Sequence, residues 1–268
     1  MKKELTILFL NVHGGITLQP LKKYLGKMSS AVDIFCFQEV PSSPFENWSP
    51  PHPNGATPDL YQQLERVLPE FQGYYLPSQS NRHKQDPRLA HQFSFGLATF
   101  VAREFSDVQI SSRRIYQPEQ EYVIEQHGTV PRDILCAVIS SKEKGIGIAN
   151  VHGLWDPQGK IDTPERVSQS YAIHDAIKQF PVGFVVGGDF NLLPDADSLT
   201  VFERRFEMRD LIKEYGISNT RSITQYKKEC RFADYVFVNK NREVRTFSVD
   251  ETADDVSDHL PLIVTVSI

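Results

Sequence analysis

The sequence predicts an α/β protein. Short, nearly continuous apolar runs rich in β-branched and aromatic residues recur along its 268 residues, which is typical of strands covered on both faces. Helix signals lie between some of these runs. The length suits one large domain or two smaller ones. Because no shift in composition marks a boundary, we expect a single domain over residues 1–268.

Eight apolar runs are predicted as strands. The first, LTILFLNV at 5–12, follows Glu4, whose charge, together with the short run, argues against a signal peptide. The other seven runs are VDIFCFQEV (32–40), SFGLATFVA (94–102), RDILCAVIS (132–140), GIGIANVHG (145–153), VGFVVGGDF (182–190), ADYVFVN (233–239) and LPLIVTVSI (260–268).

Three segments are predicted as helices. In 57–68, Thr57 is the expected N-cap and Pro58 the first helical residue, and leucines every fourth residue form one apolar face. The segment 162–180 repeats this Thr-Pro start, and 198–207 is a shorter candidate.

Two long polar stretches are predicted as loops within the domain. PSSPFENWSPPHPNGATP, at 41–58, is rich in proline and breaks all periodicity. PSQSNRHKQDPRLAHQ, at 77–92, is locally basic. Its basic side chains are candidates for contact with substrate phosphates, or they simply face water: Arg82, His83, Lys84, Arg88 and His91.

The composition excludes several classes of protein. The net charge is −5 and no basic run exists, so a large non-specific nucleic-acid surface is not expected. The three cysteines form no CxxC pair, which favours reduced thiols in a cytoplasmic protein. No apolar stretch approaches the roughly 20 residues of a membrane-spanning helix.

Polar side chains that could perform chemistry stand at the ends of the predicted strands. In VVGGDFNLLPD, Asp189 and Asn191 follow a Gly pair, and strand alternation places them on one side. The glycines permit a tight turn or a close approach of the backbone. A carboxylate can hold a water or a metal ion and a carboxamide can donate to a phosphate oxygen. The alternative is an Asx turn that ends the strand.

Further polar strand ends carry acids and histidines. Glu39 ends FCFQEV, Asp234 opens a strand in RFADYVFV, and Asp258 and His259 precede the last strand. The tetrapeptide NVHG occurs twice, beginning at Asn11 and at Asn150. We expect these ends to converge at one edge of a sheet. Oxygen ligands without a Cys/His cluster point to Mg²⁺ or Mn²⁺.

The ordered set NVHG, QEV, NVHG, GGDFNLLP, RFADYVFV and SDHLPL resembles the endonuclease/exonuclease/phosphatase superfamily, from residue 11 to residue 259. The resemblance implies a four-layer α/β sandwich, in which two central mixed β-sheets pack face to face and helices flank them. It also implies metal-dependent hydrolysis of a phosphate ester.

The resemblance assigns roles residue by residue. It implies a metal site formed by Asn11, Glu39 and Asp258. It implies catalytic roles for His152, Asp189, Asn191, Asp234 and His259. Asp189 would hold or activate the attacking water, with Asn191 as its companion amide, and Asp234 would orient His259. His152 would donate to a phosphate oxygen.

The two NVHG copies are expected to serve the site through different side chains. The resemblance falls on Asn11 in the first copy and on His152 in the second, so His13 and Asn150 should matter less for turnover. His13 stands where some branches of the superfamily carry an aspartate, which leaves a metal ligand or a packed side chain as its role.

A basic residue at the start of a predicted helix is a candidate for substrate binding. Arg166 lies in the first turn of the 162–180 helix and Lys160 in the loop before it. Either side chain could contact a phosphate, and Arg166 is our substrate-binding candidate, since a guanidinium can bond two phosphate oxygens. A solvated helix start is the alternative.

We therefore expect a Mg²⁺-dependent phosphodiesterase or nuclease, with Mn²⁺ able to replace Mg²⁺, that is cytoplasmic and monomeric. Its substrate is a phosphoester, either nucleic acid or a small molecule. The alternatives are a phosphomonoesterase acting on a small phosphorylated metabolite or inositol phosphate, and a catalytically silent binding protein. A serine hydrolase is excluded because the chain has no GxSxG motif.

Overall fold

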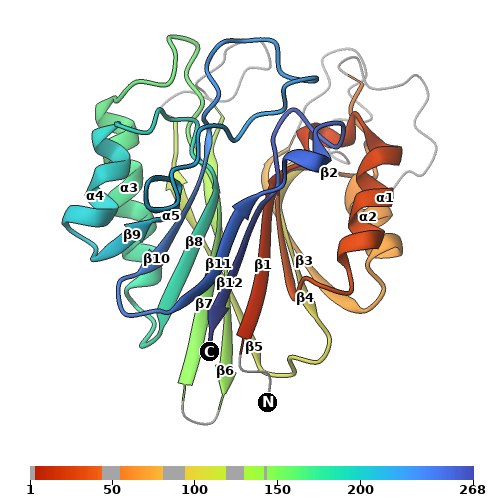
Figure 1. Ribbon diagram of the computed structural model, residues 1–268, viewed down its shortest axis with the longest axis horizontal. Coiled ribbons are helices and arrows are strands. Elements are labelled where there is room, and N and C mark those ends of the chain that lie inside the picture. Colours follow the sequence, from red (N-terminus) through yellow and green to blue (C-terminus); the bar gives the residue numbers. More distant parts are fainter. Residues whose placement is uncertain (1–3, 44–54, 81–93, 119–129, 142–143) are drawn as a thin grey trace.

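Two six-stranded β-sheets pack face to face at the centre of the protein, and helices cover both outer faces (Figure 1). The computed structural model describes residues 4–43, 55–80, 94–118, 130–141 and 144–268. Most of the proline-rich stretch, and the five basic residues that begin at Arg82, lie outside the described residues. The four layers confirm the predicted fold class.

The first sheet has the strand order β11-β12-β1-β2-β4-β3. Its strands are β1 (Glu4–Asn11), β2 (Ile34–Ser42), β3 (Phe71–Ser80), β4 (Ser94–Ala102), β11 (Val244–Val249) and β12 (Leu262–Ser267). β1 runs parallel to β2, and the other neighbours are antiparallel.

The second sheet has the order β5-β6-β7-β8-β10-β9. Its strands are β5 (Val108–Tyr116), β6 (Arg132–Ser141), β7 (Lys144–His152), β8 (Gly183–Asp189), β9 (Met208–Asp210) and β10 (Asp234–Asn239). β7 and β8 are parallel and the other pairs antiparallel. Both sheets are therefore mixed, as expected.

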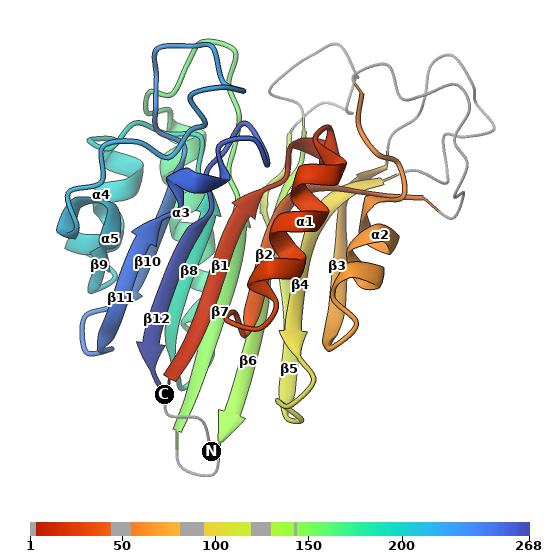
Figure 2. The ribbon, with the colours of Figure 1, turned by 45° about the vertical axis from the view of Figure 1, so that its right-hand side comes forward.

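Helices α1 (Leu18–Met28) and α2 (Leu60–Val67) cover the first sheet, and α3 (Pro164–Ile177), α4 (Asp197–Arg204) and α5 (Leu211–Glu214) cover the second (Figure 2). Two 3₁₀ turns, η1 (His13–Gly15) and η2 (Glu251–Ala253), follow strand ends. One apolar cluster fills the space between the sheets and extends under α3 and α4. A second one lies between the first sheet and α1 and α2. In the described part of the chain, no helix is long and apolar enough to cross a membrane.

The predicted helix starts have different outcomes. At α3 the prediction is confirmed, since the Thr163 hydroxyl accepts a hydrogen bond from the Arg166 N–H at 3.3 Å. At α2 it is wrong, because Asp59 is the N-cap and the helix begins at Leu60. Thr57 is engaged elsewhere: its hydroxyl donates to the Gly15 carbonyl at 2.9 Å. The prediction failed because a tertiary contact with η1 took the capping side chain.

The glycine pair before Asp189 permits close approach of two strands, as predicted. Gly188 has a φ of +133°, and a Cβ atom there would lie 2.1 Å from the Val151 carbonyl oxygen. A side chain is therefore excluded where β8 passes β7. This close pairing places the end of β8 directly beside the end of β7.

Candidate active site

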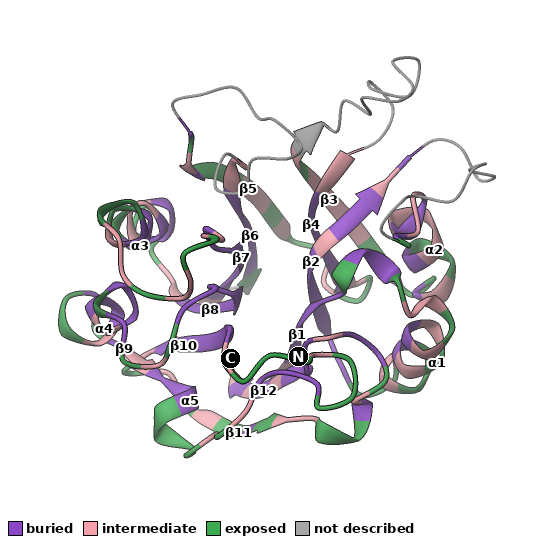
Figure 3. Ribbon diagram, turned by 90° about the horizontal axis from the view of Figure 1, so that it is seen from above, coloured by how far each residue is buried: buried purple, intermediate pink, exposed green. Residues whose placement is uncertain are grey.

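The polar strand ends meet at one edge of the two sheets, which Figure 3 shows from above. In the second sheet Asp189 is paired with His152 of β7 on one side and with Asp234 of β10 on the other. β10 is antiparallel to β8, so its first residue stands at the same edge where β7 and β8 end. Asn11, at the end of β1, is brought there by the first sheet, and its amide lies 3.0 Å from Asp189.

Glu39 reaches the site through a β-bulge in β2. Phe37 pairs with Ala98 and Val40 with Gly96, so two residues of β2 face only one residue of β4. Glu39 itself has a φ of +55°. A bulge re-aims a side chain, and a left-handed backbone at a residue other than glycine is strained. The result is that Glu39 Oε1 lies 3.1 Å from Asn11 Nδ2 and its side chain is 34% exposed.

Asn11 connects two of the acidic residues. Its Nδ2 donates to Glu39 Oε1 at 3.1 Å and to Asp189 Oδ2 at 3.0 Å. Its Oδ1 accepts from the His13 N–H at 2.9 Å. The side chain is fully buried, so one carboxamide holds two carboxylates close together at the base of the site.

Asp189 lies at the centre of the site and is 1% exposed. Its Oδ1 accepts from the Asn191 N–H at 2.8 Å, and Asn191 has a φ of +56°. This is an Asx turn that ends β8. The same geometry also leaves Asp189 facing the other site residues, so the turn and the expected catalytic role are compatible. Burial raises the pKa of Asp189, but electrostatic interactions with nearby basic groups, His259 and Arg221 among them, outweigh burial and hold the pKa well below its ordinary value.

His259 and Asp234 form a buried pair. The Nδ1 atom of His259 is 2.8 Å from both carboxylate oxygens of Asp234, and its Nε2 is 3.6 Å from Asp189 Oδ2. Burial and Arg221 lower the pKa of His259, but the carboxylates of Asp234, Asp258 and Asp189 outweigh them and raise the pKa above its ordinary value. The imidazole is thus oriented by Asp234 and stabilised in its charged form.

His152 is held differently, by an arginine. Its Nδ1 is 3.1 Å from Arg132 Nη1, and its Nε2 is 3.7 Å from Glu39 Oε1 and 3.9 Å from Asp189 Oδ2. A guanidinium only donates hydrogen bonds, so Nδ1 is the acceptor and the proton of the neutral ring is on Nε2. Burial and Arg132 also hold the pKa of His152 well below its ordinary value. His152 is therefore a neutral hydrogen-bond donor that faces the carboxylates.

Two overlapping groups of side chains have the geometry to hold a metal ion: Glu39, His152 and Asp189, and Asp189, Asp234 and His259, with ligand atoms within 4.8 Å of one another. In the second group, both carboxylate oxygens of Asp234 already lie within hydrogen-bond distance of His259 Nδ1. In the first group, Asn11 holds the carboxylates of Glu39 and Asp189 together. Because Nε2 of His152 carries a proton, the carboxylate oxygens are the main ligands of this group. The two carboxylates of this group fit a hard divalent cation, which prefers oxygen ligands.

Asp258 and His13 contact each other. Asp258 Oδ1 is 3.4 Å from His13 Nδ1, and Asp258 Oδ2 is 3.1 Å from Arg221 Nη1. Burial raises the pKa of Asp258, but His259 and Arg221 outweigh burial and lower it. Asp258 belongs to neither potential metal group among the described residues. Its metal role stays a prediction, and its present partners are His13 and Arg221.

Arg166, the predicted substrate-binding residue, is 2% exposed. Its guanidinium donates to the carbonyls of Leu154, Gly159 and Ile161, at 3.2 Å and 3.0 Å for the first two. These bonds hold the segment between β7 and α3. The contact with substrate stays a prediction, and the donors that it requires are directed at the protein backbone.

Sequence reasoning missed Arg132, Arg221 and a polar network behind the bulge. Asn150 lies between the sheets, where its Nδ2 donates to the carbonyls of Phe37 and Ala98, both at 3.1 Å, and its Oδ1 accepts from Gln38 Nε2 at 2.7 Å. No local motif distinguishes these residues. Each acquires its role from a partner far away in the sequence.

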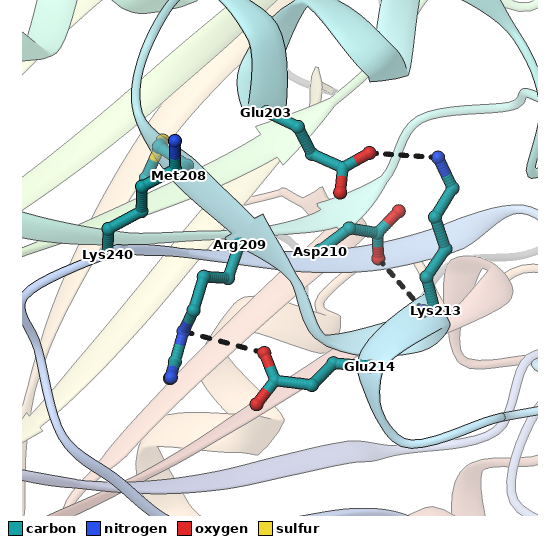
Figure 4. A pocket seen from close by; sticks show the side chains of 7 residues that line it. All are labelled: Glu203, Met208, Arg209, Asp210, Lys213, Glu214 and Lys240. Carbon is teal, nitrogen blue, oxygen red and sulfur yellow. Dashed lines mark hydrogen bonds and ion pairs between the residues drawn. The ribbon is translucent and has the colours of Figure 1, made fainter.

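Figure 4 shows a pocket away from this edge, between α4, β9 and α5. It is lined by Glu203, Met208, Arg209, Asp210, Lys213, Glu214 and Lys240. Charged side chains there pair with each other, as in the contact of Lys213 Nζ with Glu203 Oε2 at 2.9 Å. None of the predicted site residues lines this pocket, so we place the candidate active site at the strand ends.

Comparison with known proteins identifies the family and the fold of the chain. The model of a family described as the endonuclease/exonuclease/phosphatase family matches residues 8–259. No curated protein matches the chain. Among solved structures, an endonuclease/exonuclease/phosphatase from Bacteroides vulgatus superposes with a TM-score of 0.72 at 18% identity, covering 99% of both chains.

Two further solved structures with a similar fold are named as individual proteins. A mannosyl-6-phosphatase from Bacteroides thetaiotaomicron has a TM-score of 0.68 at 16% identity, with 98% of this chain and 100% of the other covered. The catalytic domain of human Nocturnin with bound sulfate has a TM-score of 0.62 at 18% identity, with 100% and 95% covered. At these identities the likeness shows the fold alone.

Proposed function

Because the chain belongs to the endonuclease/exonuclease/phosphatase family, a family of metal-dependent phosphoester hydrolases, we propose that it is a Mg²⁺-dependent phosphodiesterase or nuclease. Water would attack phosphorus, and Mn²⁺ would serve in place of Mg²⁺. We also propose that the enzyme is a cytoplasmic monomer, in keeping with its three free cysteines.

The observation that carries the proposal is the convergence of two histidines on one carboxylate. The Nε2 atoms of His259 and His152 lie 3.6 Å and 3.9 Å from Asp189 Oδ2. One ring is stabilised in its charged form by Asp234, and the other is kept neutral by Arg132. Two directed donors around one buried acceptor suit a reaction in which negative charge builds on phosphate oxygens.

Each side chain then has a proposed step. Asp189, held ionised, orients the attacking water and accepts its proton, and Asn191 assists. His259 donates its Nε2 proton to the leaving-group oxygen as the bond of that oxygen to phosphorus breaks, and Asp234 stabilises the imidazolium before the transfer. His152 donates a hydrogen bond to a second, non-bridging oxygen.

The cation would be held by Glu39 and Asp189, with Asn11 and Asp258 as further proposed ligands. When bound, a divalent cation polarises a phosphoryl oxygen and compensates the developing charge. Asn11 keeps Glu39 and Asp189 close enough to share one ion. We also propose a substrate contact for Arg166, whose guanidinium is bonded to backbone carbonyls in this structure.

A phosphomonoesterase is the second candidate, and one feature favours it. Two more cations, Arg221 and Lys160, lower the pKa of Asp189 together with the histidines. Two further cations beside the site suit a dianionic phosphate, and the neighbour from Bacteroides thetaiotaomicron is called a mannosyl-6-phosphatase.

A substrate panel with Mg²⁺ and Mn²⁺ tests the proposal. It compares single-stranded DNA, oligoadenylate, inositol phosphates, p-nitrophenyl phosphate and bis(p-nitrophenyl) phosphate. Asp189→Asn and His259→Ala should lower kcat by roughly 10²-fold or more, with unchanged circular dichroism. His174→Gln, on the outer helix α3, is the control. Wild-type turnover in both site variants would refute the assignment.

Metal binding tests the third possibility, a silent binding protein. Calorimetric titration with Mg²⁺ should show binding to the native chain and loss of binding in Glu39→Ala. Absence of binding to both, together with inactivity on the whole panel, would favour the silent protein.

A further inference from the structure

Two positively charged side chains that the proposed chemistry does not use lie beside the catalytic carboxylates. Arg221, in the segment before β10, has a side chain that is 8% exposed, and its Nη1 is 3.1 Å from Asp258 Oδ2. Lys160, in the segment between β7 and α3, is half-buried, and its Nζ donates to the Phe232 carbonyl. Burying a cation is unfavourable unless opposite charge lies near, and for Arg221 that charge is the Asp258 carboxylate.

Both cations lie over one aromatic ring. Arg221 Cζ is 4.1 Å and Lys160 Nζ is 5.9 Å from the centroid of Tyr226. The negative face of an aromatic ring attracts cations at such distances. Arg221, Lys160 and Tyr226, which we call the Tyr226 cluster, therefore form one patch although they come from two segments of the chain.

The two cations disfavour each other. Burial and the nearby charge of Arg221 lower the pKa of Lys160. The fold nevertheless holds both against the same ring. An arrangement of like charges that repel each other is stabilised when an anion binds between or beside them.

The Tyr226 cluster adjoins the catalytic centre on a defined side. Arg221 contacts Asp258 and forms an isolated backbone bridge with His259. His152 approaches Asp189 from the side of Glu39 instead. The cluster is thus next to the place proposed for the scissile phosphate, and it is distinct from the donors assigned to that phosphate.

Donors remain available on both cations. Within the described residues, Arg221 Nη2 has no hydrogen-bond acceptor and Arg221 Nε is buried without one. Lys160 Nζ has a single acceptor there, the Phe232 carbonyl. Guanidinium and ammonium groups with unused donors are the usual ligands of phosphate oxygens.

We propose that the Tyr226 cluster is a second anion subsite, and that the substrate is a phosphoester carrying a second phosphate group close to the scissile one. A phosphodiester bears one negative charge, which the histidines and a divalent cation already face. A second, terminal phosphate adds about 1.5 to 2 negative charges, which match Arg221 and Lys160. The inference rests on the proposed function for the position of the scissile group.

Binding of two non-hydrolysable phosphonates tests the subsite without turnover. Methylenediphosphonate presents two anionic groups and methylphosphonate presents one. By calorimetry in Mg²⁺ buffer, we expect the wild-type chain to bind the first about tenfold or more tightly than the second, from the added charged hydrogen bonds. In Lys160→Gln the ratio of the two affinities should fall close to one, and in Lys160→Arg it should return toward the wild-type value.

Lys178→Gln is the matched control, because it removes the same charge from an exposed residue at the end of α3. It should keep the wild-type ratio. An equal ratio in wild type and Lys160→Gln, both folded by circular dichroism, would overturn the subsite. Arg221→Lys keeps the positive charge but removes the guanidinium group that can bond two phosphate oxygens. We expect an affinity ratio between those of wild type and Lys160→Gln for this variant.

Hydrolysis assays distinguish whether the anion bound by the Tyr226 cluster is a second phosphate of the substrate or the scissile phosphate itself. The substrates are thymidine 5′-(p-nitrophenyl phosphate) and the same diester with a 3′-phosphate. The 3′-phosphate should raise kcat/KM about tenfold in wild type and much less in Lys160→Gln. If Lys160→Gln instead impairs only p-nitrophenyl phosphate, the scissile monoester occupies the cluster and the proposed substrate class is overturned. Intact phosphonate binding without any hydrolysis would refute the proposed function and leave the subsite standing.

Discussion

Replacing Asn150 by alanine should destabilise the protein strongly while leaving its chemistry comparatively intact. The side chain is fully buried between the sheets. It donates to the carbonyls of Phe37 and Ala98 and accepts from Gln38 Nε2. These bonds connect β7 to the two strands that form the bulge, so the change removes a polar link between the two halves of the sandwich.

The magnitude follows from the number of bonds lost. Each hydrogen bond contributes about 1 kcal/mol net, and a buried group left without a partner costs about 1–3 kcal/mol. Gln38 Nε2 keeps the Cys36 carbonyl as an acceptor, so the penalty falls mainly on the two carbonyls. We expect the free energy of unfolding to decrease by roughly 3–5 kcal/mol. For a domain of this size, the Tm should fall by roughly 6–15 °C.

Urea unfolding followed by circular dichroism measures this loss, and Asn11→Ala provides the comparison. Asn11 occupies the same place in the other NVHG copy, but its amide contacts Glu39 and Asp189. Assayed as folded protein, Asn11→Ala should lose far more activity than Asn150→Ala. A loss of stability below about 1 kcal/mol in Asn150→Ala would refute the network argument, since that is the value of one hydrogen bond.

Three further predictions concern the frame around the site. Arg166→Met should destabilise the chain by about 2–4 kcal/mol, because three backbone carbonyls lose a charged donor. Protease should then cut faster near 154–161, as mass spectrometry would show, and unchanged cleavage would contradict this. Gly188→Ala should reduce soluble, folded protein sharply, since its Cβ would lie 2.1 Å from a carbonyl oxygen, and a wild-type Tm would contradict it. Burial raises the pKa of Asp210 to about 6. Because this pKa is raised in the folded state, the ionised carboxylate destabilises the fold above about pH 6, and this destabilisation is lost as the pH falls toward 4. Asp210→Asn should therefore stabilise the chain by on the order of 2–3 kcal/mol at pH 8 and hardly at pH 4, and an equal gain in urea midpoints at both pH values would show that the charge is not the cause.

Much of the architecture was predictable because buried strands carry strong local signals. All eight predicted strands are present, since their apolar side chains must be covered wherever the strands lie. The helix α3 was predictable because Thr163 caps it with its own hydroxyl. α1 contains Pro20 and Gly26, which lower its helix propensity although Leu21 and Leu25 lie on one face at helical spacing. The edge strand β11 is largely exposed and lacks the periodic pattern of a buried element.

The sequence by itself determined which polar residues end buried strands, and therefore which side chains were candidates for the site. It could not distinguish the two copies of NVHG by their own letters. Asn11 faces Glu39 and Asp189, whereas Asn150 faces the backbone of the opposite sheet. The same tetrapeptide has two roles because its partners are supplied by other strands.

Only the tertiary structure decided how the site is charged. Arg132 keeps His152 neutral, and Asp234 keeps His259 charged, through contacts between residues 20 and 25 positions apart. Arg221 meets Asp258 across 37 positions. Protonation depends on the distance to other charges and to water. Those distances are set by how the two sheets pack, so no local pattern of letters contains them.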